Sequence, residues 1–281
     1  MSAQDKIDGA VDRVRNDKKD LLARIESPAS LNAIVGVHPL LAALAPEQRM
    51  AAAQRLARVA YMAATKNPTL LKCAPESIVA GVVEAAQLGL SVDGVLGHAY
   101  LVPYFDRGTQ RAQMQIGYRG FISLAYRSER IERIAADVVC ENDLFDFEEG
   151  TSPRLTHKKS LTQDRGNTIG AYAIAQLKGT TVPLFRVMPM AELLAHRERS
   201  SGYQAFKQGK IKSTPWDTDA DAMAMKTALR MLAKFLPLEE MQRASTYDEA
   251  RDQGRTQAPR TVADVLDMQE DEVEDGAAAT V

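Results

Sequence analysis

Features that would indicate a metal site or a membrane protein are scarce in this sequence. Its 281 residues include two cysteines, too few for a disulfide framework or a cysteine-based zinc site. The four histidines are widely separated and form no His-x-x-x-His pair, so we expect no bound metal. No stretch approaches the roughly 18 apolar residues of a membrane span, and residues 1–20 are rich in charge. We therefore expect a cytoplasmic protein that makes no membrane contact.

Nucleotide-binding motifs are also missing. Gly89, Gly94 and Gly97 lack the Lys-Ser/Thr of a phosphate-binding loop and the spacing of a dinucleotide fingerprint. We therefore expect no cofactor, no nucleotide hydrolysis and no catalytic residue. A metal-dependent nuclease remains an alternative because four acids lie close together, although such runs are more often solvated. These acids are Asp143, Asp146, Glu148 and Glu149. A scaffold that binds only proteins is a further alternative.

The charge is distributed unevenly along the chain. The net charge is −2, but residues 241–281 alone hold 4 basic and 10 acidic side chains and so account for −6. Aromatic residues almost disappear in the same stretch, so we predict an acidic disordered tail over residues 241–281. The remaining chain carries +4, which can form a surface for a polyanion if the cations gather on one face.

Hydrophobic periodicity and turn residues predict an α+β fold. Residues 1–30 form an N-terminal segment with a short amphipathic helix, and a helical layer follows, with helices that begin at Pro46 and Pro75. A β-hairpin over residues 99–118 then leads into a helix and a multi-strand antiparallel sheet, and a last helix spans residues 219–236. The strands of the sheet are expected at residues 134–139, 144–147, 168–177 and 182–187.

Several segments, met in this order, resemble the RecT family of phage-type recombinases. They include Tyr100-Leu-Val-Pro-Tyr104, Gln115-Ile-Gly-Tyr-Arg-Gly-Phe-Ile122, Asn142-Asp-Leu-Phe-Asp-Phe147 and Met225-Lys-Thr-Ala-Leu-Arg230. The resemblance covers roughly residues 31–238, so we take residues 31–240 as a RecT-like DNA-binding and annealing domain. Two positions depart from the family pattern: Glu129 stands where a glycine is expected after Arg-Ser, and Arg119 replaces the usual lysine.

The resemblance implies a function and partners that composition cannot indicate. It implies ATP-independent binding of single-stranded DNA and annealing of complementary strands through a duplex intermediate, in homologous or phage-type recombination. It also implies a homo-oligomer, either a ring or a helical filament, that works with a partner exonuclease and a host single-strand binding protein.

A protein that anneals strands must bind the sugar-phosphate backbone and leave the base edges free. The candidate DNA-binding residues are therefore cations that lie near planar side chains. The densest such segment runs from Arg197 to Trp216, although it could also be a solvated loop with its aromatic residues packed in the core. A second candidate is a straight row of cations on the last helix, which would otherwise be a solvated face. The third is the hairpin with the start of the following helix, where Gly117 and Gly120 permit close approach of a strand or simply tight packing.

The predicted DNA-binding residues of these three regions follow. In the Arg197–Trp216 segment they are Lys207, Lys210, Lys212 and Trp216, and in the helical row they are Lys226, Arg230 and Lys234. In the hairpin and its junction they are Arg107, Arg111, Gln115, Tyr118 and Arg119.

Overall fold

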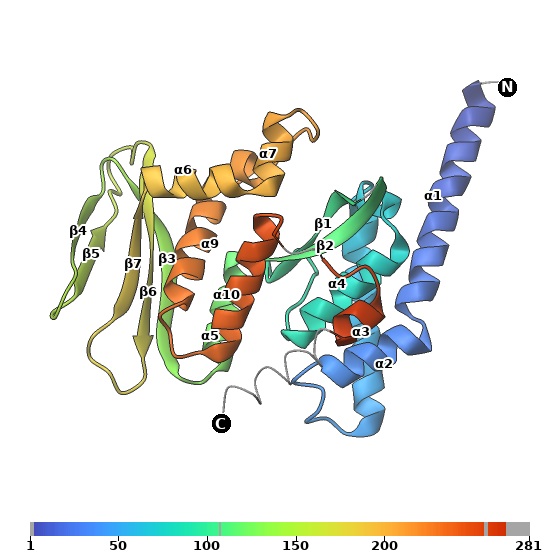
Figure 1. The fold of residues 1–281 in the computed structure, drawn as a ribbon, viewed down its shortest axis with the longest axis horizontal. Helices are drawn as coiled ribbons and strands as arrows, with labels where there is room; N and C mark the ends of the chain where they lie inside the picture. The colour runs from blue at the N-terminus through green and yellow to red at the C-terminus, as the bar shows by residue number, and fades with distance from the viewer. Residues whose placement is uncertain (1–2, 107, 256–257, 268–281) are drawn as a thin grey trace. The chain divides into compact units, whose positions relative to one another are not determined.

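The structure is a computed structural model that describes residues 3–106, 108–255 and 258–267 (Figure 1). The predicted α+β class is confirmed. The chain forms two compact units, unit 1 from Met1–Ile116 with Ala258–Val281 and unit 2 from Gly117–Gln257. This division falls inside the segment 31–240 that was taken as one domain, and the domain scheme stays a prediction. Within the described residues, no helix combines the length and the apolar character that crossing a bilayer would need.

Unit 1 contains the predicted helical layer. Its helices are α1 (Ala3–Ile25), α2 (Pro28–Val37), α3 (Pro46–Lys66), the 3-10 turn η1 (Leu70–Lys72) and α4 (Pro75–Gln87). Proline occupies the first turn of α2, α3 and α4, where its missing N–H is not needed. Helix α3 packs through four fully buried alanines at helical spacing, which lets neighbouring helices approach closely. These are Ala53, Ala57, Ala60 and Ala64.

The predicted hairpin is the other part of unit 1. Strands β1 (Ala99–Asp106) and β2 (Thr109–Ile116) pair antiparallel from Ala99↔Ile116 to Asp106↔Thr109. One face packs on α4, where a Cβ on Gly81 would lie 2.7 Å from the Leu101 side chain. The absence of a side chain at Gly81 therefore sets how closely helix and hairpin approach.

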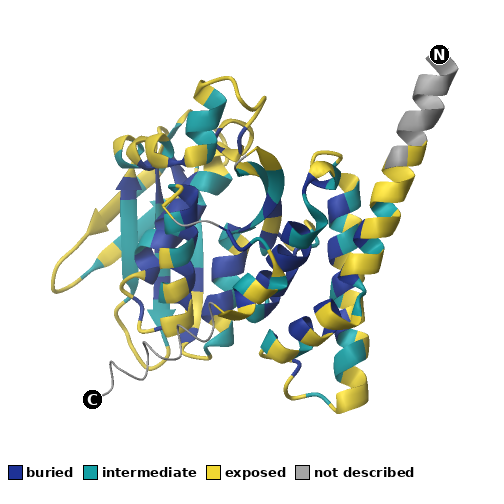
Figure 2. Ribbon diagram, turned by 45° about the vertical axis from the view of Figure 1, so that its right-hand side comes forward, coloured by how far each residue is buried: buried dark blue, intermediate teal, exposed yellow. Residues whose placement is uncertain are grey.

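Unit 2 is built around a three-stranded antiparallel sheet in the order β3-β6-β7. The strands are β3 (Ile131–Cys140), β6 (Thr168–Leu177) and β7 (Leu184–Pro189). A separate hairpin, β4 (Leu144–Glu148) with β5 (Arg154–Lys158), covers one face through aromatic contacts such as Phe145 with Tyr172. Strand β5 was not predicted. Side chains alternate along a strand, so Ala171, Ala173 and Ala175 line the opposite face and are fully buried there. Figure 2 shows buried residues gathered where the helices of this unit cover the sheet.

Helices complete unit 2 on that alanine-lined face. They are α5 (Tyr118–Arg127), α6 (Met190–Arg199), α7 (Ser201–Lys207), α8 (Pro215–Thr218), α9 (Ala220–Ala233) and α10 (Glu239–Asp252). Helix α9 packs against all three strands of the sheet and against α5, α6 and α10, so it is the central helix of the unit. Figure 1 shows the resulting order of layers: hairpin, sheet, α9 and then α10.

Helix α10 corrects the predicted tail. Residues 241–281 were expected to be disordered, but residues 241–252 belong to α10 and several of them are buried. Beyond α10, residues 262–267 are helical, and Val265 is buried in unit 1. The most acidic stretch, residues 268–281, lies outside the described residues. The predicted tail therefore begins too early, because an excess of acids and a scarcity of aromatic residues do not prevent residues 241–252 from packing as a helix.

Glu129 shows why the family pattern has a glycine after Arg-Ser. Its φ is +58°, and no other non-glycine residue in the described ranges has a positive φ. A side chain in this left-handed conformation strains the backbone by about 1 kcal/mol. The departure noted in the sequence is thus accommodated by a strained turn between α5 and β3.

We expect Glu129→Gly to raise the free energy of unfolding by about 0.5–1 kcal/mol, because glycine adopts a positive φ without strain. Urea denaturation followed by circular dichroism measures this change. Arg133→Gly is the control, since Arg133 lies exposed in strand β3 and is paired with Gln176, and glycine in a strand should destabilise by about 0.5–1 kcal/mol. Two changes of the same sign would contradict the strain argument.

Candidate nucleic-acid interface

The outward face of the hairpin in unit 1 carries two tyrosines opposite polar partners. Tyr100 lies across from Gln115 and Tyr104 across from Arg111. Arg111 is held by Asp106, with 3.4 Å between Nε and the carboxylate, and its side chain is 21% exposed. A second cation, Arg260, pairs with the same carboxylate at 2.8 Å. Arg111 is thus partly buried in an ion-pair cluster, and Arg107 at the turn lies outside the described residues.

The strand-to-helix junction places Tyr118 and Arg119 at the start of α5 in unit 2. Gly117 is the N-cap residue of this helix. Arg119 is exposed, and its Nε donates a hydrogen bond of 3.1 Å to the hydroxyl of Tyr118. The guanidinium also lies 5.7 Å from the centre of the tyrosine ring. These two residues therefore form one polar, planar group at the surface of unit 2.

A basic–aromatic surface lies on α6, α7 and the segment that follows. We define it by Arg197, Tyr203, Phe206, Lys207, Lys210 and Lys212. The guanidinium of Arg197 stacks 4.5 Å from the centre of the Tyr203 ring, and the Lys207 ammonium lies 6.0 Å from the same ring. Lys210 and Lys212 are exposed and take part in no ion pair recorded for the described residues. Of the cations in this segment, Arg197 and Lys207 lie beside the ring of Tyr203.

Glu198 is the one acid in this segment and pairs with two of its cations. Lys207 Nζ lies 2.8 Å and Arg197 3.6 Å from its carboxylate. The hydrogen bond from Lys207 lowers the pKa of Glu198, and the same bond raises the pKa of Lys207. Both side chains stay charged near neutral pH, and residues 197–216 keep five cations against one acid.

Trp216 was predicted to contact DNA, but it is a core residue. It lies in α8 with 7% of its surface exposed. Its Nε1 has no hydrogen-bond partner among the described residues. The prediction that this ring is available to a base therefore needs correction, because stacking would require α8 to move.

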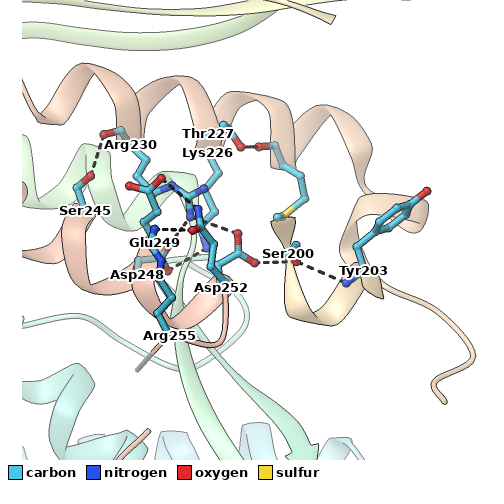
Figure 3. Close-up of polar contacts among 12 residues, drawn as sticks. Ser200, Tyr203, Lys226, Thr227, Arg230, Ser245, Asp248, Glu249, Asp252 and Arg255 are labelled. Atoms are coloured by element: carbon cyan, nitrogen blue, oxygen red, sulfur yellow. Dashed lines mark hydrogen bonds and ion pairs between the residues drawn. The ribbon is translucent and has the colours of Figure 1, made fainter. Parts of the chain in front are cut away.

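The predicted row of cations on α9 is present, but it is largely covered. Lys226 and Arg230 are only 6% and 1% exposed, whereas the side chain of Lys234 is 40% exposed. Their covering is α10, whose acidic side chains point at the row (Figure 3). The prediction of an accessible row is therefore corrected for Lys226 and Arg230.

Three carboxylates of α10 neutralise the row, and sequence reasoning missed all three. Asp248 lies 3.0 Å from Lys226 and 3.2 Å from Arg230, and Asp252 lies 3.4 Å from Arg230. Glu249 pairs with Lys234 at 2.7 Å. Burial alone would raise the pKa of Glu249, but the hydrogen bond from Lys234 and the charge of Arg230 outweigh it and lower the pKa. The available signal was the spacing of these acids, which places them on one face of a helix.

Two of the four acids considered for a nuclease, Asp143 and Asp146, are paired with cations, whereas Glu148 and Glu149 are exposed. Arg165 forms a fork on the buried carboxylate of Asp143, with hydrogen bonds of 3.0 and 2.6 Å. His157 Nε2 lies 3.0 Å from the same carboxylate. The hydrogen bonds from Arg165 hold the pKa of Asp143 far below its usual range. Asp146 pairs with Arg154 at the surface, and no group of three metal-binding side chains occurs among the residues that the structure describes.

Comparison with known proteins agrees with the resemblance seen in the sequence. The sequence model of the RecT family matches residues 54–262, and the chain belongs to this family. It is 40% identical to "Protein RecT" of Escherichia coli (strain K12) over 216 residues, which cover 74% of this chain and 75% of that protein. It is also 30% identical to "Uncharacterized protein YqaK" of Bacillus subtilis (strain 168) over 186 residues, covering 65% of this chain and 60% of that protein.

We expect the double substitution Lys226→Gln/Arg230→Gln to lower the free energy of unfolding by about 3 kcal/mol or more. It leaves Asp248 and Asp252 buried without counter-charges, and breaking a buried pair costs about that much. Urea unfolding measures the change. The matched control is Lys210→Gln/Lys212→Gln, which removes two exposed cations and should change stability by less than about 0.5 kcal/mol. Equal stability of the two variants would contradict the buried pairing.

Proposed function

We propose that this chain binds single-stranded DNA and anneals complementary strands without ATP, as a homo-oligomeric ring or filament in recombination. It acts in the cytoplasm with a partner exonuclease and a host single-strand binding protein, and it has no catalytic activity of its own. Membership of the RecT family supports the proposal. The observation that carries it is the exposed basic–aromatic surface of unit 2, where cations outnumber acids five to one over residues 197–216.

The basic–aromatic surface is suited to binding the phosphates of a strand rather than its base edges. Lysine ammonium groups such as those of Lys210 and Lys212 attract phosphate without reading sequence, so they hold any strand. The ring of Tyr203 and the guanidinium of Arg197 add planar faces that contact bases or sugars without using Watson–Crick edges. A strand held in this way keeps its edges free for a complement, which is the requirement for annealing.

Two other functions explain the observations less well. A nuclease would need carboxylates that are free to hold a metal, whereas the carboxylate of Asp143 is saturated by Arg165, His157 and a backbone N–H. A protein-binding scaffold would not need cations gathered beside aromatic rings. We therefore propose annealing in preference to both.

We expect complementary oligonucleotides to anneal faster with the protein than without it, in buffer that contains a chelator and no ATP. A gel shift with one labelled strand, run with and without magnesium, distinguishes the three functions. Binding without cleavage supports annealing, magnesium-dependent cleavage supports a nuclease, and the absence of any shift supports a scaffold. An absolute requirement for ATP would also contradict the proposal.

We expect Lys207→Gln/Lys210→Gln/Lys212→Gln to weaken binding of oligonucleotides of any sequence and to flatten its salt dependence. Each phosphate contact to a single strand contributes about 0.7 to the slope of log affinity against log salt, so the slope should fall by about 2. Fluorescence anisotropy over a series of salt concentrations measures it.

The control for this prediction removes the same charge from unit 1. Lys19, Lys66 and Lys72 are exposed lysines of its helical layer, and their replacement by glutamine should leave the slope unchanged. If both triple variants lower the slope equally, net charge rather than the basic–aromatic surface determines binding.

A further inference from the structure

Helix α10 is held within unit 2 in two different ways along its length. In its N-terminal half, Met241 and Ala244 are buried apolar side chains, and Glu240 pairs with Arg127 of α5 at 3.0 Å. In its C-terminal half the buried side chains are polar or charged. These are Ser245, Asp248, Arg251 and Asp252. The N-terminal half is therefore fixed by apolar contact, and the C-terminal half is held chiefly by charge.

The charge contact has the pattern of an anionic polymer laid on a cationic row. The three cations, Lys226 and Arg230 on α9 and Lys234 at its C-cap, recur every four residues. Asp248 lies against both Lys226 and Arg230, Asp252 lies against Arg230, and Glu249 lies against Lys234. Figure 3 shows Asp248 and Asp252 beside Lys226 and Arg230. The hydroxyl of Ser200 steadies Asp252 through a hydrogen bond of 2.8 Å. Carboxylates in these positions stand where the phosphates of a strand would lie if the row were open.

Such a contact can be replaced by another anion. Ion pairs removed from water repay little more than the desolvation of their charges, so they fix the position of α10 more than they stabilise it. A phosphate offers the same guanidinium and ammonium groups more acceptor oxygens than a carboxylate does. With α10 packed on α9, the buried Nε of Arg230 also has no hydrogen-bond partner among the described residues.

We propose that the C-terminal half of α10, residues 245–252, is a displaceable cover over a latent phosphate-binding row. Single-stranded DNA displaces Asp248, Glu249 and Asp252 and takes their place on Lys226, Arg230 and Lys234. The row is thus closed in the free protein and open in the bound one. This inference rests on the proposed binding of single-stranded DNA and adds to it a regulation of the binding surface by the chain itself.

Hydrogen exchange on the full chain tests the displacement directly. Oligothymidylate is added at saturating concentration, and amide protection of α10 is compared with that of the free protein. We expect the amides of residues 245–252 to lose at least about tenfold in protection, while those of residues 242–244, which are the first in α10 with a backbone acceptor, stay protected as an internal reference. Unchanged or increased protection of residues 245–252 in a DNA-bound sample overturns the proposal.

Removal of the covering charges tests the latent row. We expect Asp248→Asn/Glu249→Gln to bind oligothymidylate at least about tenfold more tightly and to steepen the salt slope by about 1.4. That is about 0.7 for each of Lys226 and Lys234, because Arg230 stays paired with Asp252. Glu148→Gln/Glu149→Gln is the matched control, because it removes the same charge from adjacent exposed acids on strand β4 and the turn after it. A folded variant with the slope of this control overturns the proposal.

Two further measurements apply if the double variant does not fold or if the unmodified protein does not bind. If the double variant does not fold, Glu249→Gln alone releases the partly exposed Lys234 and should steepen the slope by about 0.7, and no change would overturn the proposal. If the unmodified protein fails to bind oligothymidylate at all, the proposed function itself is wrong. Binding without any response of α10 contradicts this inference alone.

Discussion

Charge that is buried inside a folded unit must be matched by opposite charge, and this constraint organises the helical side of unit 2. Arg230 is 1% exposed and Lys226 is 6% exposed on the helix that packs against every strand of the sheet. Neither cation could remain there without the carboxylates of Asp248 and Asp252. The position of α10 along α9 is therefore determined by pairing, because a shift of one residue would leave two buried charges uncompensated.

The same constraint separates two kinds of positive surface on one unit. On the basic–aromatic surface, Lys210 and Lys212 stand in water and need no partner, so they attract a polyanion at long range. On α9 the cations are already neutralised and contribute little to the outside field. Unit 2 thus has an exposed basic–aromatic surface that a polyanion can reach first and a row of cations that is covered. The ion pairs with the carboxylates of α10 keep this row covered.

The sequence predicted the fold well where interactions between residues close in the chain determine the secondary structure. Prolines at helix starts, alternation in β3, β6 and β7, and the turn of the hairpin predicted most of the fold, and the ordered motifs indicated the family. Burial could not be predicted, because Lys226 and Arg230 have the spacing of a solvated face as well as of a paired one. Helix α10 was missed because the buried face of its C-terminal half is built from polar residues such as Ser245, Asp248 and Asp252, which hydropathy counts as exposed. The opposite error occurred at Trp216: the cations close to it in the sequence suggested an exposed ring, whereas the ring is buried.

The pairing of α10 with α9 also has a consequence for the length of strand that the protein recognises. Because α10 is part of the same chain, its acids are always present at a high effective concentration beside the row, and no dilution removes them. A single phosphate, or a mononucleotide, competes for one cation at a time and is replaced at once. A strand that is already held at Lys210 and Lys212 brings several phosphates that are tethered to one another, and these compete as one ligand. The chain's own acids would then act as a minimum-length filter that favours polymers over the abundant nucleotides of a cell.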